Sequence, residues 1–273
     1  MNPRPYSRRD FIRTTASVAG GTIAAPSLVS SRALGEKKAA KPAALGGEPV
    51  RQAPFPEWPV QTELDEKYLM DALRRNEWCR LYGDITTRFE EKWAEMLGVK
   101  YATGVVNGTS ALYAGLNALE VGPGDEVLVP PYTFVATVNA VIQQFALPVF
   151  VDSDPEAMLI DADKIEERIT ENTRCIMPVH LGGLVADMDT ISNVAQKHNL
   201  SVIEDACQAH YAEWRGKKAG TLGDVGCFSF QSTKILPCGE GGAIVSNSED
   251  LLDKYHAFQN NGRDRQTGTR NGY

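Results

Sequence analysis

The sequence lacks several features that would assign it to a common class at once. It has no uninterrupted apolar stretch of 18 residues, so it offers no candidate for a membrane-spanning helix. Its five cysteines are an odd number, spread widely and without a Cys-x-x-Cys pair, which excludes a zinc-ribbon site and a disulfide framework. It also lacks a basic surplus, with 28 Lys and Arg against 35 Asp and Glu, which argues against a nucleic-acid binder. No internal repeat is present.

What is present is an ordinary globular composition. The 273 residues are 42% hydrophobic and 23% charged, which excludes a disordered chain, a coiled coil and a collagen-like repeat. The charge is unevenly distributed, however. Residues 1–41 hold eight Lys and Arg against two Asp and Glu, whereas the remaining 232 residues hold 20 basic and 33 acidic ones. The chain therefore joins a basic leader to an acidic globular part.

The leader has the plan of an export signal. Arg8 and Arg9 are followed by Phe11 and Ile12, then by a mildly apolar run at 14–29 and small residues near 31–33. This pattern resembles the twin-arginine signal of bacteria, which sends folded proteins across the inner membrane; the alternative is a disordered basic tail. We expect a signal over 1–33, a flexible linker over 34–47 and one domain over 48–273. The predicted location is the periplasm or cell envelope, with the twin-arginine export machinery as a partner, and the cytoplasm if the signal does not function.

The domain alternates between helical and extended patterns. The extended segments are short and almost entirely apolar. Strands with this pattern are buried on both faces and belong to a mostly parallel sheet between helices, so we predict an α/β fold. The expected strands lie at 102–106, 127–129, 148–151, 175–179, 201–203, 225–230 and 243–246. The expected helices lie at 64–73, 89–97, 111–119, 137–145, 162–169 and 188–198.

Ligands of open α/β sheets bind beyond the carboxyl ends of the strands, so the polar residues at those ends are the candidates. The first such end, at 107–110, joins a strand to a helix start, where Thr109 and Ser110 supply hydroxyls beside unpaired backbone N–H groups. This segment is either a phosphate cradle or an ordinary N-terminal helix cap.

Two further ends hold an acid and an amine. Asp205 closes a fully apolar strand, where it either points its carboxylate into the ligand crevice or caps the next turn. Lys234 follows a buried strand and precedes a Gly-rich turn at 239–242. A desolvated lysine there is a nucleophilic amine of the kind that Schiff-base chemistry needs, whereas Lys217 and Lys218 fit a surface turn better.

Together the three ends supply a phosphate cradle, an acid for a pyridinium nitrogen and a Schiff-base lysine. These are the groups that pyridoxal 5'-phosphate requires, and we predict it as the cofactor. No metal site is predicted.

At this point the chain resembles the DegT/DnrJ/EryC1/StrS aminotransferases, which are fold-type-I pyridoxal-phosphate enzymes. The likeness runs from about Gly46 to Asn261. The motifs that support it are Asn-Gly-Thr-Ser-Ala-Leu (107–112), Gly-Pro-Gly-Asp-Glu-Val (122–127), Val-Pro-Pro-Tyr-Thr-Phe-Val-Ala-Thr (129–137), Pro-Val-His (178–180), Glu-Asp-Ala-Cys-Gln-Ala-His (204–210), Gly-Cys-Phe-Ser-Phe-Gln-Ser-Thr-Lys (226–234) and Gly-Glu-Gly-Gly (239–242).

The resemblance implies a role for each matching position. Lys234 would be the catalytic residue, holding the cofactor as an internal aldimine and then moving the proton between carbon atoms. Asp205 would pair with the ring nitrogen and Gln208 with the ring hydroxyl. The phosphate would be bound by Thr109, Ser110 and Ser229. Phe134 would stack on the ring, although an aromatic residue at such a position is usually part of the core. For His180 and His210, packing beside the site is the favoured interpretation.

The resemblance also implies a reaction. Family members that dehydrate sugars have His at the lysine position, so Lys234 favours transfer of an amino group from glutamate or glutamine to a keto sugar or similar ketone. It implies a homodimer and a smaller C-terminal domain beyond residue 273. The resembled family acts mostly on keto sugars attached to nucleotides. Such nucleotide sugars are cytoplasmic, which conflicts with an export signal. The alternatives are therefore a pyridoxal-phosphate-binding sensor or scaffold without turnover, or an envelope interaction protein that retains the fold.

Overall fold

The computed structural model describes residues 41–265, apart from residues 77, 79, 81 and 82. The predicted signal over 1–33 and the first residues of the predicted linker lie outside the described residues. The described end of the linker contains a short 3-10 helix, η2 (Ala43–Leu45). The chain divides into two compact units after Pro56, and every other element belongs to the second unit. None of the helices in the described part of the chain is long and apolar enough to span a bilayer.

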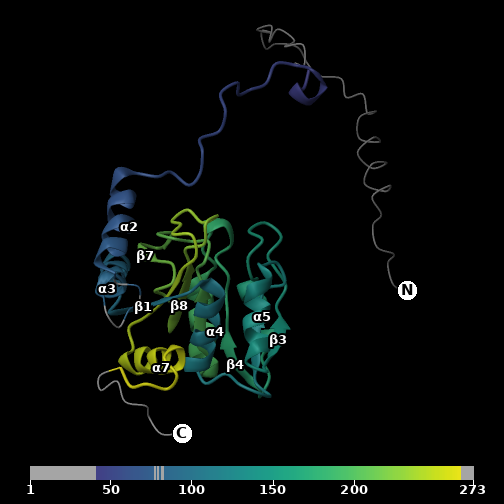
Figure 1. Ribbon diagram of the computed structural model, residues 1–273. Coiled ribbons are helices and arrows are strands. Elements are labelled where there is room, and N and C mark those ends of the chain that lie inside the picture. The colour runs from purple at the N-terminus through teal and green to yellow at the C-terminus, as the bar shows by residue number, and fades with distance from the viewer. Residues whose placement is uncertain (1–40, 77, 79, 81–82, 266–273) are drawn as a thin grey trace, which may run out of the picture. The chain divides into compact units, whose positions relative to one another are not determined.

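A seven-stranded sheet forms the centre of the second unit (Figure 1). Its spatial order is β1-β9-β8-β5-β4-β2-β3. Six strands run in the same direction, whereas β9, between β1 and β8, runs antiparallel to both of its neighbours. The strands are β1 (Tyr101–Val105), β2 (Glu126–Val129), β3 (Leu147–Phe150), β4 (Thr173–Ile176), β5 (Ser201–Asp205), β8 (Val225–Ser229) and β9 (Gly242–Ser246). The predicted α/β fold with a mostly parallel sheet is confirmed, and every predicted strand overlaps an observed one.

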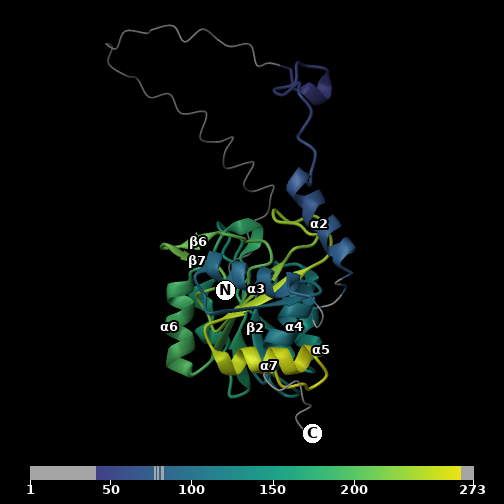
Figure 2. The same ribbon diagram turned by 60° about the vertical axis from the view of Figure 1, so that its left-hand side comes forward.

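Helices cover both faces of this sheet because successive strand residues point to opposite sides. Val127 and Ile203 face α4 (Gly108–Ala118), α5 (Val135–Gln143) and α7 (Glu249–Gln259). Their neighbours in sequence, Leu128 and Val202, point to the other face and pack near α6 (Met188–His198). On that face Phe228 packs against α3 (Ile85–Leu97). Figure 2 shows α6 and α4 on opposite sides of the sheet. The alternation produces two apolar layers with the strands between them.

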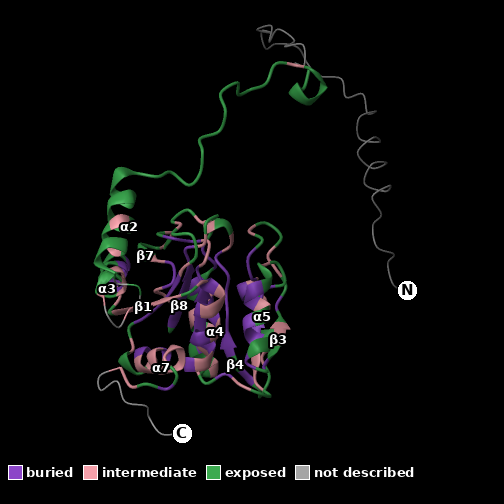
Figure 3. Ribbon diagram, viewed as in Figure 1, coloured by how far each residue is buried: buried purple, intermediate pink, exposed green. Residues whose placement is uncertain are grey.

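The first predicted helix forms but stays outside these layers. α2 (Glu63–Arg75) begins with a capping box between Thr62 and Asp65, and it has no buried residue (Figure 3). Its apolar residues Leu69 and Tyr68 are 73% and 53% exposed. The predicted amphipathic pattern is therefore real, although its apolar stripe has no core to face within the described residues.

Two helical predictions need correction. The segment predicted as helical at 162–169 forms two 3-10 turns, η3 (Ala162–Lys164) and η4 (Glu166–Arg168), instead of one α-helix. The first turn is closed by the Lys164 N–H, which donates to the Asp161 carbonyl three residues earlier. The sequence prediction also omitted α7, which is capped by Ser248, and a short hairpin of β6 (Glu213–Trp214) and β7 (Lys217–Lys218). In that hairpin Lys217 is exposed, as a surface turn predicts.

Candidate active site

A cavity of about 740 Å³ opens at the carboxyl ends of β5 and β8, beside the start of α4. Parallel strands end at the same edge of a sheet, so segments distant in the sequence meet there. Six of the seven predicted site residues line this cavity: Thr109, Phe134, Asp205, Gln208, Ser229 and Lys234.

The start of α4 presents backbone N–H groups to this cavity. Asn107 is the N-cap residue, and its side chain accepts a hydrogen bond from the Ser110 N–H at 2.8 Å. The cap interpretation is thus correct for the segment, but its residue is Asn107 rather than a hydroxyl-bearing one. Gly108 follows because a Cβ there would lie 2.7 Å from both the Cys207 sulfur and the Ser229 Cβ. The helix start is therefore pressed against the ends of two strands, with its first N–H groups available to an anion.

Asp205 is the buried acid of the cavity. Asp205 is only 5% exposed. Oδ2 accepts a hydrogen bond from the Thr137 hydroxyl at 2.7 Å, and Oδ1 accepts one from the Cys207 N–H at 3.3 Å. Both alternatives considered from the sequence therefore hold, since the carboxylate caps the following turn and also lines the cavity.

Lys234 lies in the turn that follows β8. Its N–H donates to the Gln231 carbonyl at 2.8 Å, and its own carbonyl accepts a hydrogen bond from the Trp58 indole N–H at 3.2 Å. The residue is partly buried, and its neighbours Thr233 and Ile235 also line the cavity. The surrounding turn is thus held by hydrogen bonds at both ends of the lysine residue.

The carboxylate of Glu204, next to Asp205 in β5, is fully buried. Glu204 accepts hydrogen bonds from His180 Nε2 and from the N–H groups of Gly220, Leu222 and Gly223, at 2.6–2.8 Å. The other ring nitrogen of His180 accepts a hydrogen bond from a backbone N–H, so the proton of this neutral ring is on Nε2. His180 is therefore a satisfied core histidine beside the site, as the sequence analysis favours.

Gln208 connects the cavity to the loop after β4. Its Oε1 accepts a hydrogen bond from the N–H of Gly182 at 2.8 Å. Gly182 belongs to η5 (Leu181–Gly183) and adopts φ of 62°, a left-handed conformation that favours glycine. The amide of Gln208 therefore keeps its N–H₂ donor group for other partners at the cavity.

His210 contacts the last residue of β8. Its Nε2 lies 2.7 Å from the Ser229 carbonyl oxygen, so Nε2 is the protonated nitrogen. Burial lowers the pKa of His210 below its ordinary value, which favours the neutral ring. Among the described residues Nδ1 has no hydrogen-bond partner, although His210 lines the cavity.

Phe134 differs from the expectation for an aromatic residue near a helix. It is the N-cap residue of α5 and is 64% exposed, rather than part of the core. Phe134 directly precedes α5, which begins two residues earlier than predicted, and it lines the cavity. The sequence offers one signal for this position, which is that an aromatic residue directly precedes the start of a helix.

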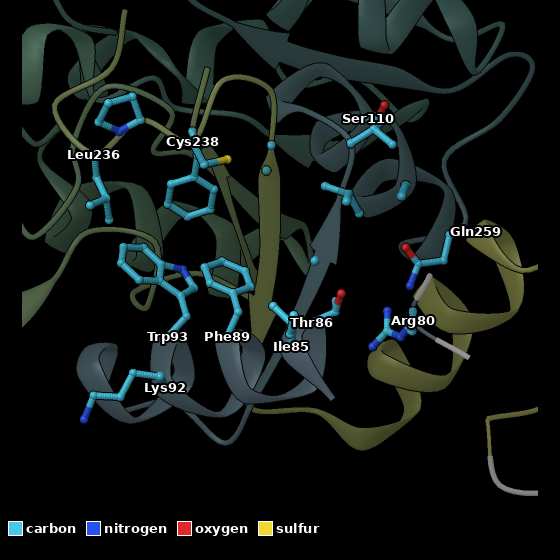
Figure 4. Close-up of a pocket in the computed structure, with 18 of the residues that line it drawn as sticks. Arg80, Ile85, Thr86, Phe89, Lys92, Trp93, Ser110, Leu236, Cys238 and Gln259 are labelled. Carbon is cyan, nitrogen blue, oxygen red and sulfur yellow. The ribbon is translucent and has the colours of Figure 1, made fainter. Parts of the chain in front are cut away.

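Ser110 lies elsewhere. It lines a second, mostly apolar pocket of about 930 Å³, formed largely by α3, β1 and the 236–242 segment. Figure 4 shows Ser110 on the opposite side of that pocket from Trp93 and Leu236. Ser110 is therefore not among the residues that line the first cavity, and its N–H is bound by Asn107.

Comparison with known proteins assigns the family. A model of the DegT/DnrJ/EryC1/StrS aminotransferase family matches residues 60–273. The chain belongs to this family. The motifs that carry the resemblance in the sequence all fall inside the matched range.

Members of this family and their structures are similar over most of the chain. GDP-perosamine synthase of Caulobacter vibrioides is 48% identical over 200 residues, covering 73% of this chain and 54% of that protein. A putative L-glutamine:3-amino-2,3-dideoxy-scyllo-inosose aminotransferase of Micromonospora echinospora is 42% identical over 229 residues, covering 82% and 54%. A solved structure from Bacillus subtilis with bound cofactor PMP has a TM-score of 0.69 at 35% identity, covering 78% of this chain and 48% of that one. The chain spans about half the length of the curated relatives it matches.

Three residues outside the predicted set lie next to predicted ones. Thr137 donates to Asp205, Trp58 donates to the Lys234 carbonyl, and Glu204 directly precedes Asp205 in β5. Thr137 and Glu204 lie inside recognisable motifs, so proximity in sequence to Phe134 and Asp205 is a usable signal. Trp58 has no such signal, because 176 positions separate it from its partner. Among the described residues no three His, Cys, Asp or Glu side chains are grouped to hold a metal ion.

Proposed function

We propose that the protein is a pyridoxal-phosphate-dependent aminotransferase that moves an amino group from an amino-acid donor, glutamate or glutamine, to a keto sugar or a similar ketone. One observation carries the proposal: the amine of Lys234, the buried acid Asp205 and the glycine-lined start of α4 share one cavity. The relatives named above as perosamine synthase and as a glutamine-dependent aminotransferase support the reaction class.

The described residues fit this cofactor. A cavity of about 740 Å³ lies within the usual range for small-molecule sites. The start of α4 offers N–H groups to a phosphate, and Gly108 leaves the approach free of a Cβ. Asp205 is acceptor-only when ionised, which suits a protonated ring nitrogen. These groups would hold, respectively, the phosphate and the ring.

Each residue then has a proposed task. Lys234 would hold the cofactor through its Nζ, and as a free amine it would take a proton from the donor's α-carbon and return it to the cofactor. Asp205 would keep the ring nitrogen protonated. When bound, pyridoxal phosphate supplies an electron sink for the charge left on the substrate carbon.

The remaining residues would orient the cofactor. Thr109 and Ser229 would bind the phosphate, Gln208 would contact the ring hydroxyl, and Phe134 would stack on the ring face. Ser110 is left out of this set because its residue lines the other pocket.

The test is direct. Borohydride treatment of the protein loaded with pyridoxal phosphate, followed by peptide mass analysis, should find the reduced cofactor on Lys234, and Lys234→Ala should abolish this modification and turnover. Lys217→Ala, a lysine of the surface hairpin, is the matched control and should retain both. Absence of any modified lysine in the wild type refutes cofactor chemistry. If Lys234 is the modified residue but the absorbance of the loaded, unreduced protein does not change on addition of glutamate or glutamine, the protein is instead a binding protein without turnover.

We also propose that the protein is a homodimer. Apolar side chains are exposed around the cavity, with Ile235 at 65%, Phe134 at 64% and Tyr132 at 57%. A second copy packed over this rim would exclude water from the site. Sedimentation should give a dimer for the wild type and a monomer for Ile235→Asp. A monomeric wild type contradicts this part of the proposal.

Export of the folded protein is the third part of the proposal. It rests on Arg8 and Arg9 in the basic leader and on the acidic remainder. Replacing both arginines by lysine keeps the charge but should retain the protein in the cytoplasm, as measured by cell fractionation in a bacterial host. Equal distribution of the variant and the wild type would refute a twin-arginine signal.

A further inference from the structure

Two threonines from one turn of the chain form a hydrogen-bonded pair behind Asp205. Thr137 Oγ1 lies 2.7 Å from Asp205 Oδ2, and Thr133 Oγ1 lies 2.7 Å from Thr137 Oγ1. Thr137 is completely buried and Asp205 is 5% exposed, whereas Thr133 is partly exposed. The pair therefore runs from the rim of the molecule to the one buried acid of the cavity.

The direction of these hydrogen bonds follows from proton counting. A hydroxyl has one proton, and Thr137 gives it to the carboxylate, so Thr133 must be the donor to Thr137. The Asp205 carboxylate accepts two hydrogen bonds, one from the Thr137 hydroxyl and one from the Cys207 N–H. The chain of donors thus ends on this carboxylate.

Thr137 is the third residue of α5, and Thr133 lies four residues earlier, before the helix begins. The hydroxyls of the two threonines contact each other. Both groups are arranged around the carboxylate of another element, 68 positions away. Because Thr137 lies in the first turn of α5, the helix N-terminus also favours a negative charge here.

We propose that Thr137, backed by Thr133, is a positioning residue that holds the ionised Asp205 in place for a cationic ring nitrogen in the cavity. This inference rests on the proposed function, since it concerns how that cofactor site is organised. It also explains why the turn that presents Phe134 continues into Thr137: one helix start places an aromatic ring on the cavity and a donor on its acid.

Two probes separate this role from a merely structural one. The first is pyridoxal phosphate, and the second is its analogue in which the ring nitrogen is replaced by a C–H group, so that no proton is available to Asp205. Dissociation constants for both are measured by titration calorimetry. The variants are Thr137→Val, which keeps the shape but removes the hydroxyl, and Thr137→Ser, which keeps the hydroxyl.

Thr137→Val should weaken binding of pyridoxal phosphate about tenfold or more, as expected for loss of a hydrogen bond to a charged group. It should change the affinity for the ring-carbon analogue less than about threefold. Thr137→Ser should restore the affinity for pyridoxal phosphate. Thr173→Val removes another buried threonine hydroxyl, bonded to Glu126 away from the cavity, and should alter neither affinity.

Three results overturn the proposal. Equal weakening of both probes by Thr137→Val means that the hydroxyl supports only the fold. Unchanged binding in that variant means that the hydroxyl does not act on Asp205. Failure of Thr137→Ser to restore affinity means that the methyl group, not the hydroxyl, matters. If Thr137→Val does not fold, Thr133→Val makes the same test one step further out, with a smaller but equally probe-selective loss expected. A wild-type protein that binds neither probe refutes the proposed function itself, and this inference with it.

Discussion

The indole N–H of Trp58 donates a hydrogen bond to the carbonyl oxygen of Lys234, 176 positions away, at 3.2 Å. Trp58 is 54% exposed, so this contact lies at the rim of the molecule. The segment that precedes α2 is thereby attached to the turn that holds the proposed catalytic amine. The backbone position of Lys234 thus depends on a residue far outside its motif.

Trp58→Phe should weaken retention of pyridoxal phosphate by a factor of about five, because one neutral hydrogen bond at a partly exposed position is worth about 1 kcal/mol. The dissociation constant measured by absorbance titration checks this. Trp78→Phe is the matched control, since the Trp78 indole bonds to its neighbour Asn76 instead. Equal losses in the two variants would contradict a specific role for Trp58.

Gly108→Ala should destabilise the protein and weaken cofactor binding together. The added Cβ would fall 2.7 Å from Ser229 Cβ and the Cys207 sulfur, so the start of α4 must move away from β8. Overpacking of this kind costs about 1–3 kcal/mol in the free energy of unfolding, which urea denaturation measures. Gly122→Ala, where no atom lies within 4 Å of the new Cβ, should be neutral. A stable Gly108→Ala variant with normal affinity would disprove the close approach.

Glu204→Gln should be among the most destabilising single changes outside the cavity. The carboxylate accepts four hydrogen bonds, and a glutamine amide would turn an N–H₂ group toward donors that need an acceptor. Leaving a buried donor without its acceptor costs about 1–3 kcal/mol. Glu213→Gln removes an exposed partner of Lys218 and should cost below about 0.5 kcal/mol. Similar unfolding midpoints for the two variants would argue against the buried network.

His210 should make the stability depend on pH below about 6.5. Burial lowers its pKa in the folded protein, so the unfolded chain binds the proton more tightly and acid favours unfolding. The contribution is present above the ordinary pKa of 6.5 and is lost as the pH falls below that value. His210→Gln keeps a donor for the Ser229 carbonyl without a titrating ring.

The measurement is the unfolding free energy of wild type and His210→Gln at pH 7.5 and 5.5. The advantage of the wild type should shrink at the lower pH. His256, whose pKa is also lowered mainly by burial, should leave a residual pH dependence in the variant. A difference between the proteins that is constant with pH would show that His210 does not titrate differently on folding.

Much of the fold was predictable because strand burial leaves a strong pattern. Apolar runs such as 127–129 and 201–203 have no alternative to a sheet covered on both faces. The end of α3 was equally predictable, since Gly98 adopts φ of 73° there. Helix starts were less so: α4 and α5 begin two to three residues before the predicted positions, because their caps are Asn107 and a residue without a capping side chain.

The candidate site divides in the same way. Asp205 and Lys234 were recognisable because polar groups at the ends of apolar strands require a ligand or a cap. Ser110 directly follows Thr109, but adjacent residues at a helix start point about 100° apart, so Thr109 lines the cavity and Ser110 lines the second pocket. The phosphate-binding role of Ser110 stays a prediction.

By itself the sequence determined which residues form strands, which strand ends are polar and which family the motifs resemble, because these properties are local and periodic. The tertiary structure alone decided which of those ends share a cavity, that Asp205 is held by Thr137, and that Trp58 reaches Lys234. Such contacts join residues 68 and 176 positions apart. No local pattern specifies them, because they arise only once the order and direction of the strands have brought the segments together.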